Sequence, residues 1–195
     1  MINRNKRKPL CGVATNDADY YTQKRVNGKN VICHFYNIWS HMITRCYSET
    51  YQKKKPTYKS CTVCDDWLIF SNFRKWMDSQ YWYMLCLDKD ILVKGNKIYS
   101  PETCIFISKE LNSFTTDSGS TRGNFPIGVH FHKKAGKFRA NCNNPFTLKV
   151  ESLGLFSCPN EAHKAWKARK HELACQWANI VGDERLKHAL RNRYL

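Results

Sequence analysis

Two cysteines separated by two residues, Cys61 and Cys64, have the spacing with which a tight turn presents two thiolates to one metal ion. A structural Zn²⁺ site needs four nitrogen or sulfur ligands, so this turn requires a second pair. Cys33 and Cys46 precede it and could complete the set, although they stand 13 positions apart, unlike the ligands of a compact zinc knuckle. The alternative is that these cysteines are small buried hydrophobic residues.

The chain contains ten cysteines in all, and their redox state depends on the compartment. The opening MINRNKRKPL has basic residues but lacks the apolar core of a secretory signal, and no apolar run reaches 18 residues. We therefore expect an intracellular protein with no membrane span and with reduced thiols. Four further cysteines are expected to be buried small hydrophobic residues: Cys86, Cys142, Cys158 and Cys175.

The charge of the chain indicates a polyanionic partner. Lys and Arg number 32 against 16 acidic residues, a net charge of +16 that opposes folding through self-repulsion. Residues 1–60 carry 12 basic and 3 acidic side chains, residues 61–121 carry 6 and 8, and residues 122–195 carry 14 and 5. Nucleic acid is the first candidate partner for the two basic ends, and an anionic membrane surface is the second. The acidic middle favours a cation site.

Three C-terminal segments alternate between apolar and polar residues, as strands do. They span 127–132, 137–142 and 148–156, and short turns separate them, so we expect an antiparallel meander. A helix follows, with Pro159 at its start, where a missing N–H costs nothing. One stripe of this helix is expected to cover the apolar face of the sheet: Ala162, Ala165, Trp166, Arg169, Leu173 and Trp177.

The other face of this sheet is predicted to be open, polar and basic. Strands that enter the major groove of DNA can read base edges with side chains of this kind. Double-stranded DNA is therefore the expected partner, although charge alone suits RNA equally. The side chains that alternation places on this face are His130, His132, Lys137, Arg139 and Asn141.

Over about 50 residues this segment resembles the plant ethylene-response-factor (APETALA) type of DNA-binding domain. The matching strings are Gly128-Val129, Gly136-Lys137-Phe138, Leu153-Gly154-Leu155-Phe156 and Asn160-Glu161-Ala162 to Ala165-Trp166. The resemblance implies that the exposed sheet face reads DNA. The candidate DNA-binding residues are then His130, His132, Lys137, Arg139, Asn141 and Asn143, with Lys133, Lys134 and Lys149 beside them. The segment departs from the plant pattern at His130 and His132, where arginines are usual, and a partly charged histidine contributes less to phosphate binding.

Residues 30–115 resemble a phage family of HNH-type homing endonucleases, through FYNIWSHMITRCY, CTVCDDWLIFSNFRKW and LDKDILVKGNKIYSPETC. The resemblance implies a ββα unit that holds Mg²⁺ or Mn²⁺ and cuts DNA. It places Asp88 and Asn112 as ion ligands, Lys89 where the family has its general-base histidine, and Asp90 as a substitute base or ligand. It also offers Cys104 in place of Cys61 as a zinc ligand. A phage protein of this kind would act in the host cytoplasm.

The expected helices and strands together predict an α+β fold in two parts. Helical periodicity covers 33–47 and a stretch near 70–77, for which Ser71 is the expected N-cap. The expected organisation is a basic, irregular lead-in (1–30), an HNH-like module (31–115), a linker (116–125), the sheet-plus-helix domain (126–180) and a basic C-terminal helix (181–195).

Two functions follow from this organisation. The first is a metal-dependent endonuclease that nicks or cuts double-stranded DNA. The second is a catalytically inactive DNA-binding protein on a degenerate HNH scaffold, acting in regulation or in interference with a host process. A lysine is a poor base at neutral pH unless burial lowers its pKa, so Lys89 separates the two. The target sequence and the oligomeric state stay open.

Overall fold

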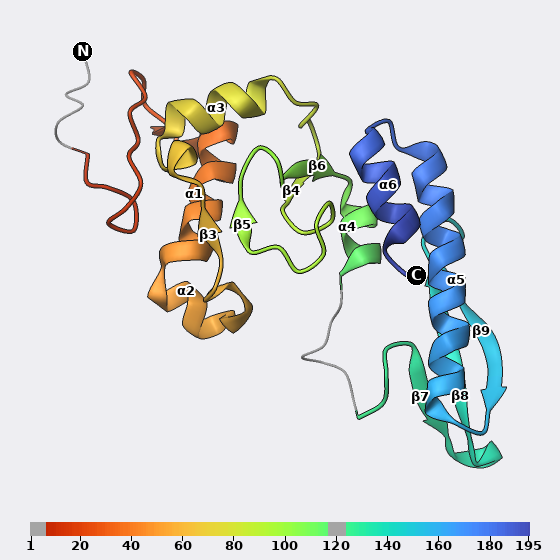
Figure 1. The fold of residues 1–195 in the computed structure, drawn as a ribbon. Helices are drawn as coiled ribbons and strands as arrows, with labels where there is room; N and C mark the ends of the chain where they lie inside the picture. Colours follow the sequence, from red (N-terminus) through yellow and green to blue (C-terminus); the bar gives the residue numbers. More distant parts are fainter. Residues whose placement is uncertain (1–6, 117–123) are drawn as a thin grey trace. The chain divides into compact units, whose positions relative to one another are not determined.

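The computed structural model describes residues 7–116 and 124–195, and its contacts divide the chain into two compact units, Met1–Ile107 and Ser108–Leu195 (Figure 1). The fold is α+β, as predicted. Most of the predicted linker, 116–125, lies outside the described residues. The division falls before the short helix that follows Ser108, so this helix belongs to the C-terminal unit. No helix of the described ranges is both long and apolar enough to cross a membrane.

The described part of the N-terminal unit contains three α-helices and several short strands. Its helices are α1 (His34–Tyr47), α2 (Glu49–Lys54) and α3 (Phe70–Asp78). Three small two-stranded sheets accompany them: antiparallel β1 (Gln23–Val26) with β2 (Lys29–Ile32), parallel β3 (Thr62–Val63) with β5 (Ile98–Tyr99), and antiparallel β4 (Cys86–Asp88) with β6 (Ile105–Ile107).

Helices α1 and α3 meet in an aromatic core. The periodicity of α1 buries Trp39, Met42 and Ile43, and α3 contributes Phe70, Phe73 and Met77. The indole Nε1 of Trp39 donates a hydrogen bond of 2.7 Å to the backbone oxygen of Trp67, so this polar group is satisfied inside the core. Both predicted helices are therefore confirmed, and their apolar stripes form one core cluster.

Two local predictions in this unit are wrong. The lead-in of residues 1–30 is not irregular throughout, because Asn27 and Gly28 adopt positive φ angles of 49° and 75° and close a hairpin between β1 and β2. Ser71 does not cap α3, which begins at Phe70. Instead, the carboxylate of Asp17 accepts a 2.9 Å hydrogen bond from the Ser71 backbone N–H, so the cap comes from a distant segment.

The C-terminal unit contains the predicted three-stranded antiparallel sheet. Its strands are β7 (Val129–His132), β8 (Lys137–Asn144) and β9 (Lys149–Phe156), in the order β7-β8-β9. Strand β7 pairs with the first half of β8 only, from Val129 opposite Ala140 to His132 opposite Lys137. The β8–β9 register shifts between Ala140 and Asn141, which marks a bulge. The second half of β8 therefore has a neighbouring strand on one side only.

Helices complete this unit: α4 (Lys109–Thr115), α5 (Pro159–Ile180) and α6 (Glu184–Asn192). Helix α5 begins at Pro159, as predicted, and packs against all three strands (Figure 1). The predicted stripe is correct at Ala162, Trp166 and Leu173. Its other members, Ala165, Arg169 and Trp177, are half-buried, and the buried face of the helix also includes Lys170, Ala174 and Ala178.

The basic C-terminal segment forms α6, which packs on α5 and buries Leu186 and Leu190. The Asp183 side chain accepts a hydrogen bond from the Leu186 backbone N–H and caps the helix. The apolar face of α6 is thus used inside its own unit.

Candidate nucleic-acid interface

The strand register divides the sheet into a face toward α5 and a face away from it. His130 lies opposite Arg139 and His132 lies opposite Lys137, so these four side chains share one face. The neighbouring Ala140 and Cys142 point the other way and are fully buried under α5. The predicted open face therefore exists, and it also carries Asn141 and Asn143.

Two polar atoms at the centre of the open face lack hydrogen-bond partners. The guanidinium Nε of Arg139 and the amide Oδ1 of Asn141 are both inaccessible, and neither has a partner within the described residues. The two residues are successive members of the same face of β8. Buried polar atoms without a partner are uncommon in folded proteins and require an explanation. Both side chains are half-buried, so a ligand on the open face would contact them through their accessible atoms and not through these two.

The β7–β8 turn adds two exposed lysines to this end of the sheet. Lys133 and Lys134 lie in a single helical turn that ends at Gly136, whose φ of 60° is left-handed. The Nδ1 atom of His132 accepts a 3.3 Å hydrogen bond from the Ala135 backbone N–H, so its Nε2 is the protonated nitrogen. The ring therefore presents a donor at the edge of the open face.

One predicted residue, Lys149, lies apart from this set. It pairs with Asn144 at the start of β9 and shares a face with Glu151, which contacts α5. Strand alternation therefore places Lys149 on the α5 face of the sheet, exposed at the far end from the β7–β8 turn. On β9 the open face carries Val150, Ser152 and Leu155 instead.

An ion pair connects the sheet to α5. Arg169 donates to both carboxylate oxygens of Glu151, at 2.7 and 3.0 Å, and Asn144 donates to the same carboxylate at 2.7 Å. The hydrogen bonds from Arg169 and then Asn144 lower the pKa of Glu151 to about 2. This fork-to-carboxylate geometry holds the orientation of β9 on the helix. Arg169, predicted as part of the apolar stripe, thus acts as an anchor.

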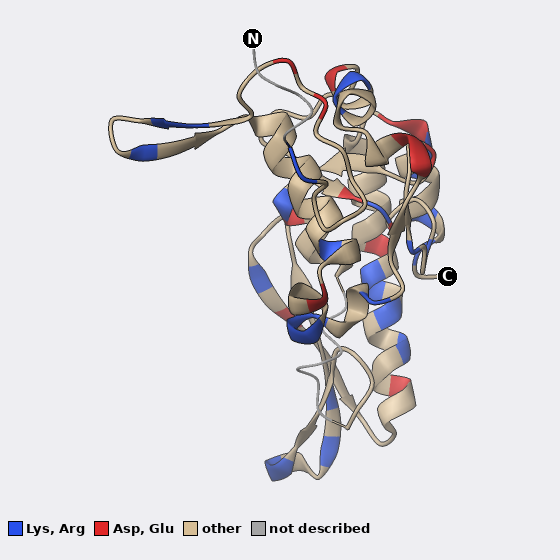
Figure 2. Cartoon of the chain, turned by 90° about the vertical axis from the view of Figure 1, so that its left-hand side faces the viewer, with Lys and Arg blue, Asp and Glu red and all other residues tan. Residues whose placement is uncertain are grey.

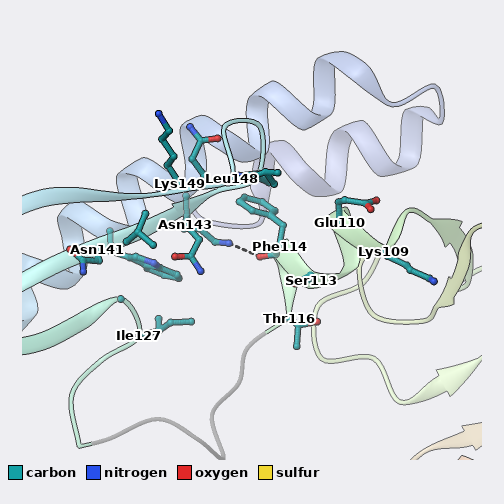
Figure 3. A pocket seen from close by; sticks show the side chains of 16 residues that line it. Lys109, Glu110, Ser113, Phe114, Thr116, Ile127, Asn141, Asn143, Leu148 and Lys149 are labelled. Carbon is teal, nitrogen blue, oxygen red and sulfur yellow. Dashed lines mark hydrogen bonds between the residues drawn. The ribbon is translucent and has the colours of Figure 1, made fainter.

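A cavity of about 840 Å³ lies beside the unpaired half of β8 (Figure 3). Asn141 and Asn143 reach it from β8, and Phe114 and Ser113 border it from α4. Its charged lining residues are three lysines and one carboxylate: Lys109, Lys149, Lys170 and Glu110. The cavity therefore joins Asn141 and Asn143 of the open face to Lys149, which comes from the other face of the sheet.

Lys170 is buried beside this cavity among three aromatic rings. Its Nζ lies 3.4 Å from the centroid of Phe114, 5.3 Å from that of Tyr194 and 5.8 Å from that of Trp166. It also donates a hydrogen bond to the backbone oxygen of Phe114. The ammonium thus joins α5 to α4 and to the C-terminal segment. Burial lowers the pKa of Lys170 to about 8.

The candidate catalytic residues are divided between the units. In the N-terminal unit, Asp88 is the last residue of β4 and Lys89 and Asp90 follow it, whereas Asn112 lies in α4 of the C-terminal unit. The Asp88 Oδ1 atom accepts hydrogen bonds from the backbone N–H groups of Asp90 and Ile91, at 2.9 and 2.7 Å, and so closes the turn after the strand. Burial, and then the charge of Asp90, raise the pKa of Asp88.

Lys89 is buried and paired with its neighbour. Its Nζ lies 3.1 Å from Asp90 Oδ2. Burial by itself lowers the pKa of Lys89, but the attraction of Asp90, Cys61 and Asp88 outweighs burial, and the pKa is raised. The raised pKa favours the ammonium form of this side chain, which is a poor general base at neutral pH. Asp88 acts in this turn as a backbone cap, a role that requires no bound ion.

We expect that the protein will not nick supercoiled plasmid in Mg²⁺ or Mn²⁺, because the raised pKa of Lys89 makes it a poor general base. Agarose electrophoresis after an incubation of several hours measures nicking, and a gel shift in EDTA measures binding. Lys89→His introduces an imidazole at this position and tests whether this turn supports catalysis. Nicking by the wild type that Asp88→Ala abolishes, with binding retained, would contradict the expectation.

Four of the five candidate zinc ligands lie in or against one core cluster, and Cys33 lies outside it. All ten cysteines are free, and Cys46, Cys61 and Cys104 belong to the aromatic core. Burial, and then the neighbouring Cys61, raise the pKa of Cys46 to about 12, and burial raises the pKa of Cys104 to about 12. Cys33 Sγ lies 3.7 Å from the Tyr20 hydroxyl.

No group of three or more His, Cys, Asp or Glu side chains in residues 7–116 and 124–195 is placed to hold a metal ion. Zinc ligation by Cys33, Cys46, Cys61, Cys64 or Cys104 therefore stays a prediction. Of the four cysteines that were expected to be buried, only Cys142 is buried. Cys86, Cys158 and Cys175 are half-buried.

Sequence reasoning missed two features that bear on function. The β1–β2 hairpin carries Lys24, Arg25 and Lys29, and its signal was the Asn27-Gly28 pair flanked by strand-forming residues. Lys170 was missed because a lysine in a helix is normally solvated. Its spacing of four residues from Trp166 and from Ala174 was the available signal, since both of these are buried.

Comparison of this chain with known protein families, with curated proteins and with solved structures finds no match. The functional conclusion accordingly depends on the geometry and charge described above.

Proposed function

We propose that the C-terminal unit binds double-stranded DNA through the face of the β7–β8–β9 sheet that points away from α5. The observation that carries the proposal is the strand register, which places Arg139 and Asn141 on the sheet face that α5 does not cover, together with His130, His132 and Lys137. Arginine pairs with guanine O6 and N7, and asparagine pairs with adenine N6 and N7, so both residue types match base edges in the major groove.

The surroundings of this pair support a polyanion as the partner. Lys137 and His130 lie on the same face, and Lys133 and Lys134 extend it at the turn. Figure 2 shows the lysines and arginines of this unit in blue, with a cluster at the β7–β8 turn. Residues 122–195 carry 14 basic and 5 acidic side chains, which favours phosphate contacts.

Duplex DNA suits this surface better than duplex RNA. Strands can enter the wide major groove of B-form DNA, whereas the deep, narrow major groove of A-form RNA excludes side chains from the bases. The ion pair between Lys89 Nζ and Asp90 Oδ2, together with the raised pKa of Lys89, favours binding without cleavage. Of the two functions predicted from the sequence, we therefore propose the DNA-binding protein that does not cut.

Arg139→Ala in the full-length protein is expected to weaken binding to a 25-base-pair duplex about 10- to 30-fold at 100 mM salt, because one charge-assisted base contact is lost. Fluorescence anisotropy measures the dissociation constant. The slope of log affinity against log salt should change little, by about one at most, since a base contact is not a phosphate contact.

Lys164→Ala is the matched control, because Lys164 is an exposed cation on α5, which covers the other face of the sheet. If both variants bind like the wild type, the open face is not the interface. If the wild type binds single-stranded or duplex RNA more tightly than duplex DNA, RNA is the partner and the proposal of DNA is wrong.

A further inference from the structure

The β1–β2 hairpin is a two-stranded ribbon with no covering element. Every residue of both strands is exposed. Figure 2 shows the ribbon extending at the left of the view, with its basic residues in blue. The Cys33 N–H donates a 2.8 Å hydrogen bond to the Thr22 oxygen and continues the ladder at the base. The ribbon therefore stands out from the core of its own unit.

Local interactions define the turn of this ribbon. Asn27 and Gly28 have the positive φ angles of a tight hairpin turn, and the Arg25 Nε donates a 3.2 Å hydrogen bond to the Gly28 oxygen. A hairpin without a hydrophobic face is marginally stable by itself in water. Three apolar residues of the ribbon each expose more than a third of their surface: Val26, Val31 and Ile32. Such a ribbon gains stability when a partner covers it.

The two faces of the ribbon carry different chemistry. The register places Lys24 opposite Val31 and Val26 opposite Lys29, so one face holds two lysines and two valines. The other face holds Gln23, Arg25, Asn30 and Ile32. The segment 20–32 contains no acidic residue. Gln, Arg and Asn are the side chains that pair with base edges, and the lysines match phosphates.

We propose that the β1–β2 ribbon is a second DNA-binding element, which lies in the major groove of duplex DNA. The major groove is wide enough to admit a two-stranded ribbon. The face with Gln23, Arg25 and Asn30 contacts base edges, and Lys24 and Lys29 contact the flanking phosphates. Like charges on two ribbons disfavour a second copy of the chain as the occupant. The identity of the partner rests on the proposed function of the C-terminal sheet.

The test is a triple variant of the full-length protein, Lys24→Ala, Arg25→Ala and Lys29→Ala, in the same anisotropy assay. We expect binding to duplex DNA to weaken about 30- to 100-fold and the salt slope to fall by about two. The matched control removes three exposed lysines from α2 and the residue after it, by Lys53→Ala, Lys54→Ala and Lys55→Ala. It removes the same charge from the same unit and should weaken binding less than 5-fold. Thermal unfolding should be unchanged in both variants, because all six side chains are exposed.

Further measurements separate the two proposals. If the ribbon variant binds duplex DNA as tightly as the α2 control does, while Arg139→Ala weakens that binding, the ribbon proposal fails and the sheet proposal stands. If the wild type does not bind duplex DNA at all, both fail. The double variant Gln23→Ala and Asn30→Ala keeps the net charge and should reduce the difference in affinity between duplexes of different sequence. If it weakens binding to every duplex by the same factor, these residues do not contact bases. A change in sedimentation of the ribbon variant, with DNA affinity intact, would assign the ribbon to self-association.

Discussion

Gly128→Ala is expected to destabilise the C-terminal unit by about 3 kcal/mol, since two separate costs fall on the same residue. A Cβ atom at this position would lie 2.0 Å from Trp166 Cδ1, on the largest buried side chain of α5. The backbone φ of +82° is also a conformation that residues with a Cβ rarely adopt. Overpacking costs about 1–3 kcal/mol and the left-handed backbone about 1–2 kcal/mol more.

Two other glycines provide matched controls for this prediction. Gly136→Ala meets no atom within 4 Å but has a φ of +60°, so it should cost about 1 kcal/mol for the backbone alone. Gly182→Ala has neither a close neighbour nor a positive φ, and should be neutral within about 0.5 kcal/mol. Urea unfolding of the full-length protein measures all three. Hydrogen exchange of β8 amides assigns the loss to this unit.

The origin of the Gly128 effect can also be tested. Trp166→Leu in the Gly128→Ala background removes the ring that the Cβ would strike, so it should recover part of the lost stability. If Gly128→Ala costs no more than Gly136→Ala, the indole moves aside freely and does not lock the sheet on α5. A locked sheet matters for function, because Gly128 accepts the Asn141 N–H hydrogen bond at 2.9 Å and so positions the centre of the proposed interface.

Lys170 should make the stability of the C-terminal unit rise with pH between about 8 and 10.5. Burial lowers the pKa of its ammonium from 10.5 to about 8 in the folded state. Between these values the unfolded chain holds a proton that the folded chain has released, so stability increases with pH. Below pH 8 both states are protonated and the cost of burying the charge is fully present. Between pH 7 and pH 10 the gain is on the order of 2–3 kcal/mol.

The measurement is the free energy of urea unfolding at several pH values, for the wild type and for Lys170→Met. The difference between the two proteins isolates Lys170, because the other titrating groups are common to both. We expect the advantage of methionine to shrink by about 2–3 kcal/mol from pH 7 to pH 10. Lys167→Met, at an exposed lysine of the same helix, should show a difference that does not vary with pH. A flat difference for Lys170 would mean that the aromatic rings hold the ammonium as well as water does.

These two predictions connect stability to the proposed interface. Gly128 and Lys170 both line the cavity beside β8, and both keep the sheet packed against helices of the same unit. Variants at these positions should therefore weaken DNA binding through lost folding, with an unchanged salt slope. Variants on the open face should weaken binding without a change in unfolding. The two classes of variant separate the scaffold from the surface that it presents.

Several elements could be predicted from local pattern because local physics determines them. Alternation of apolar residues marked the three strands of the C-terminal sheet and assigned Arg139 and Asn141 to the open face. Helical periodicity placed α1, and Pro159 marked the start of α5. The charge of the two ends predicted a polyanionic partner, which the structure leaves as a proposal. In each case the signal lies within a few residues of the feature.

Other features depended on residues far apart in the chain. The capping of α3 by Asp17, the burial of Lys170 under Phe114, and the contact of Gly128 with Trp166 each join distant segments. The sequence by itself determined the fold class, the strands of the sheet and the basic character of its open face, because periodicity and charge are properties of neighbouring residues. Only the tertiary structure decided which polar groups are buried and paired, because desolvation and its compensation depend on what the folded chain brings alongside each group.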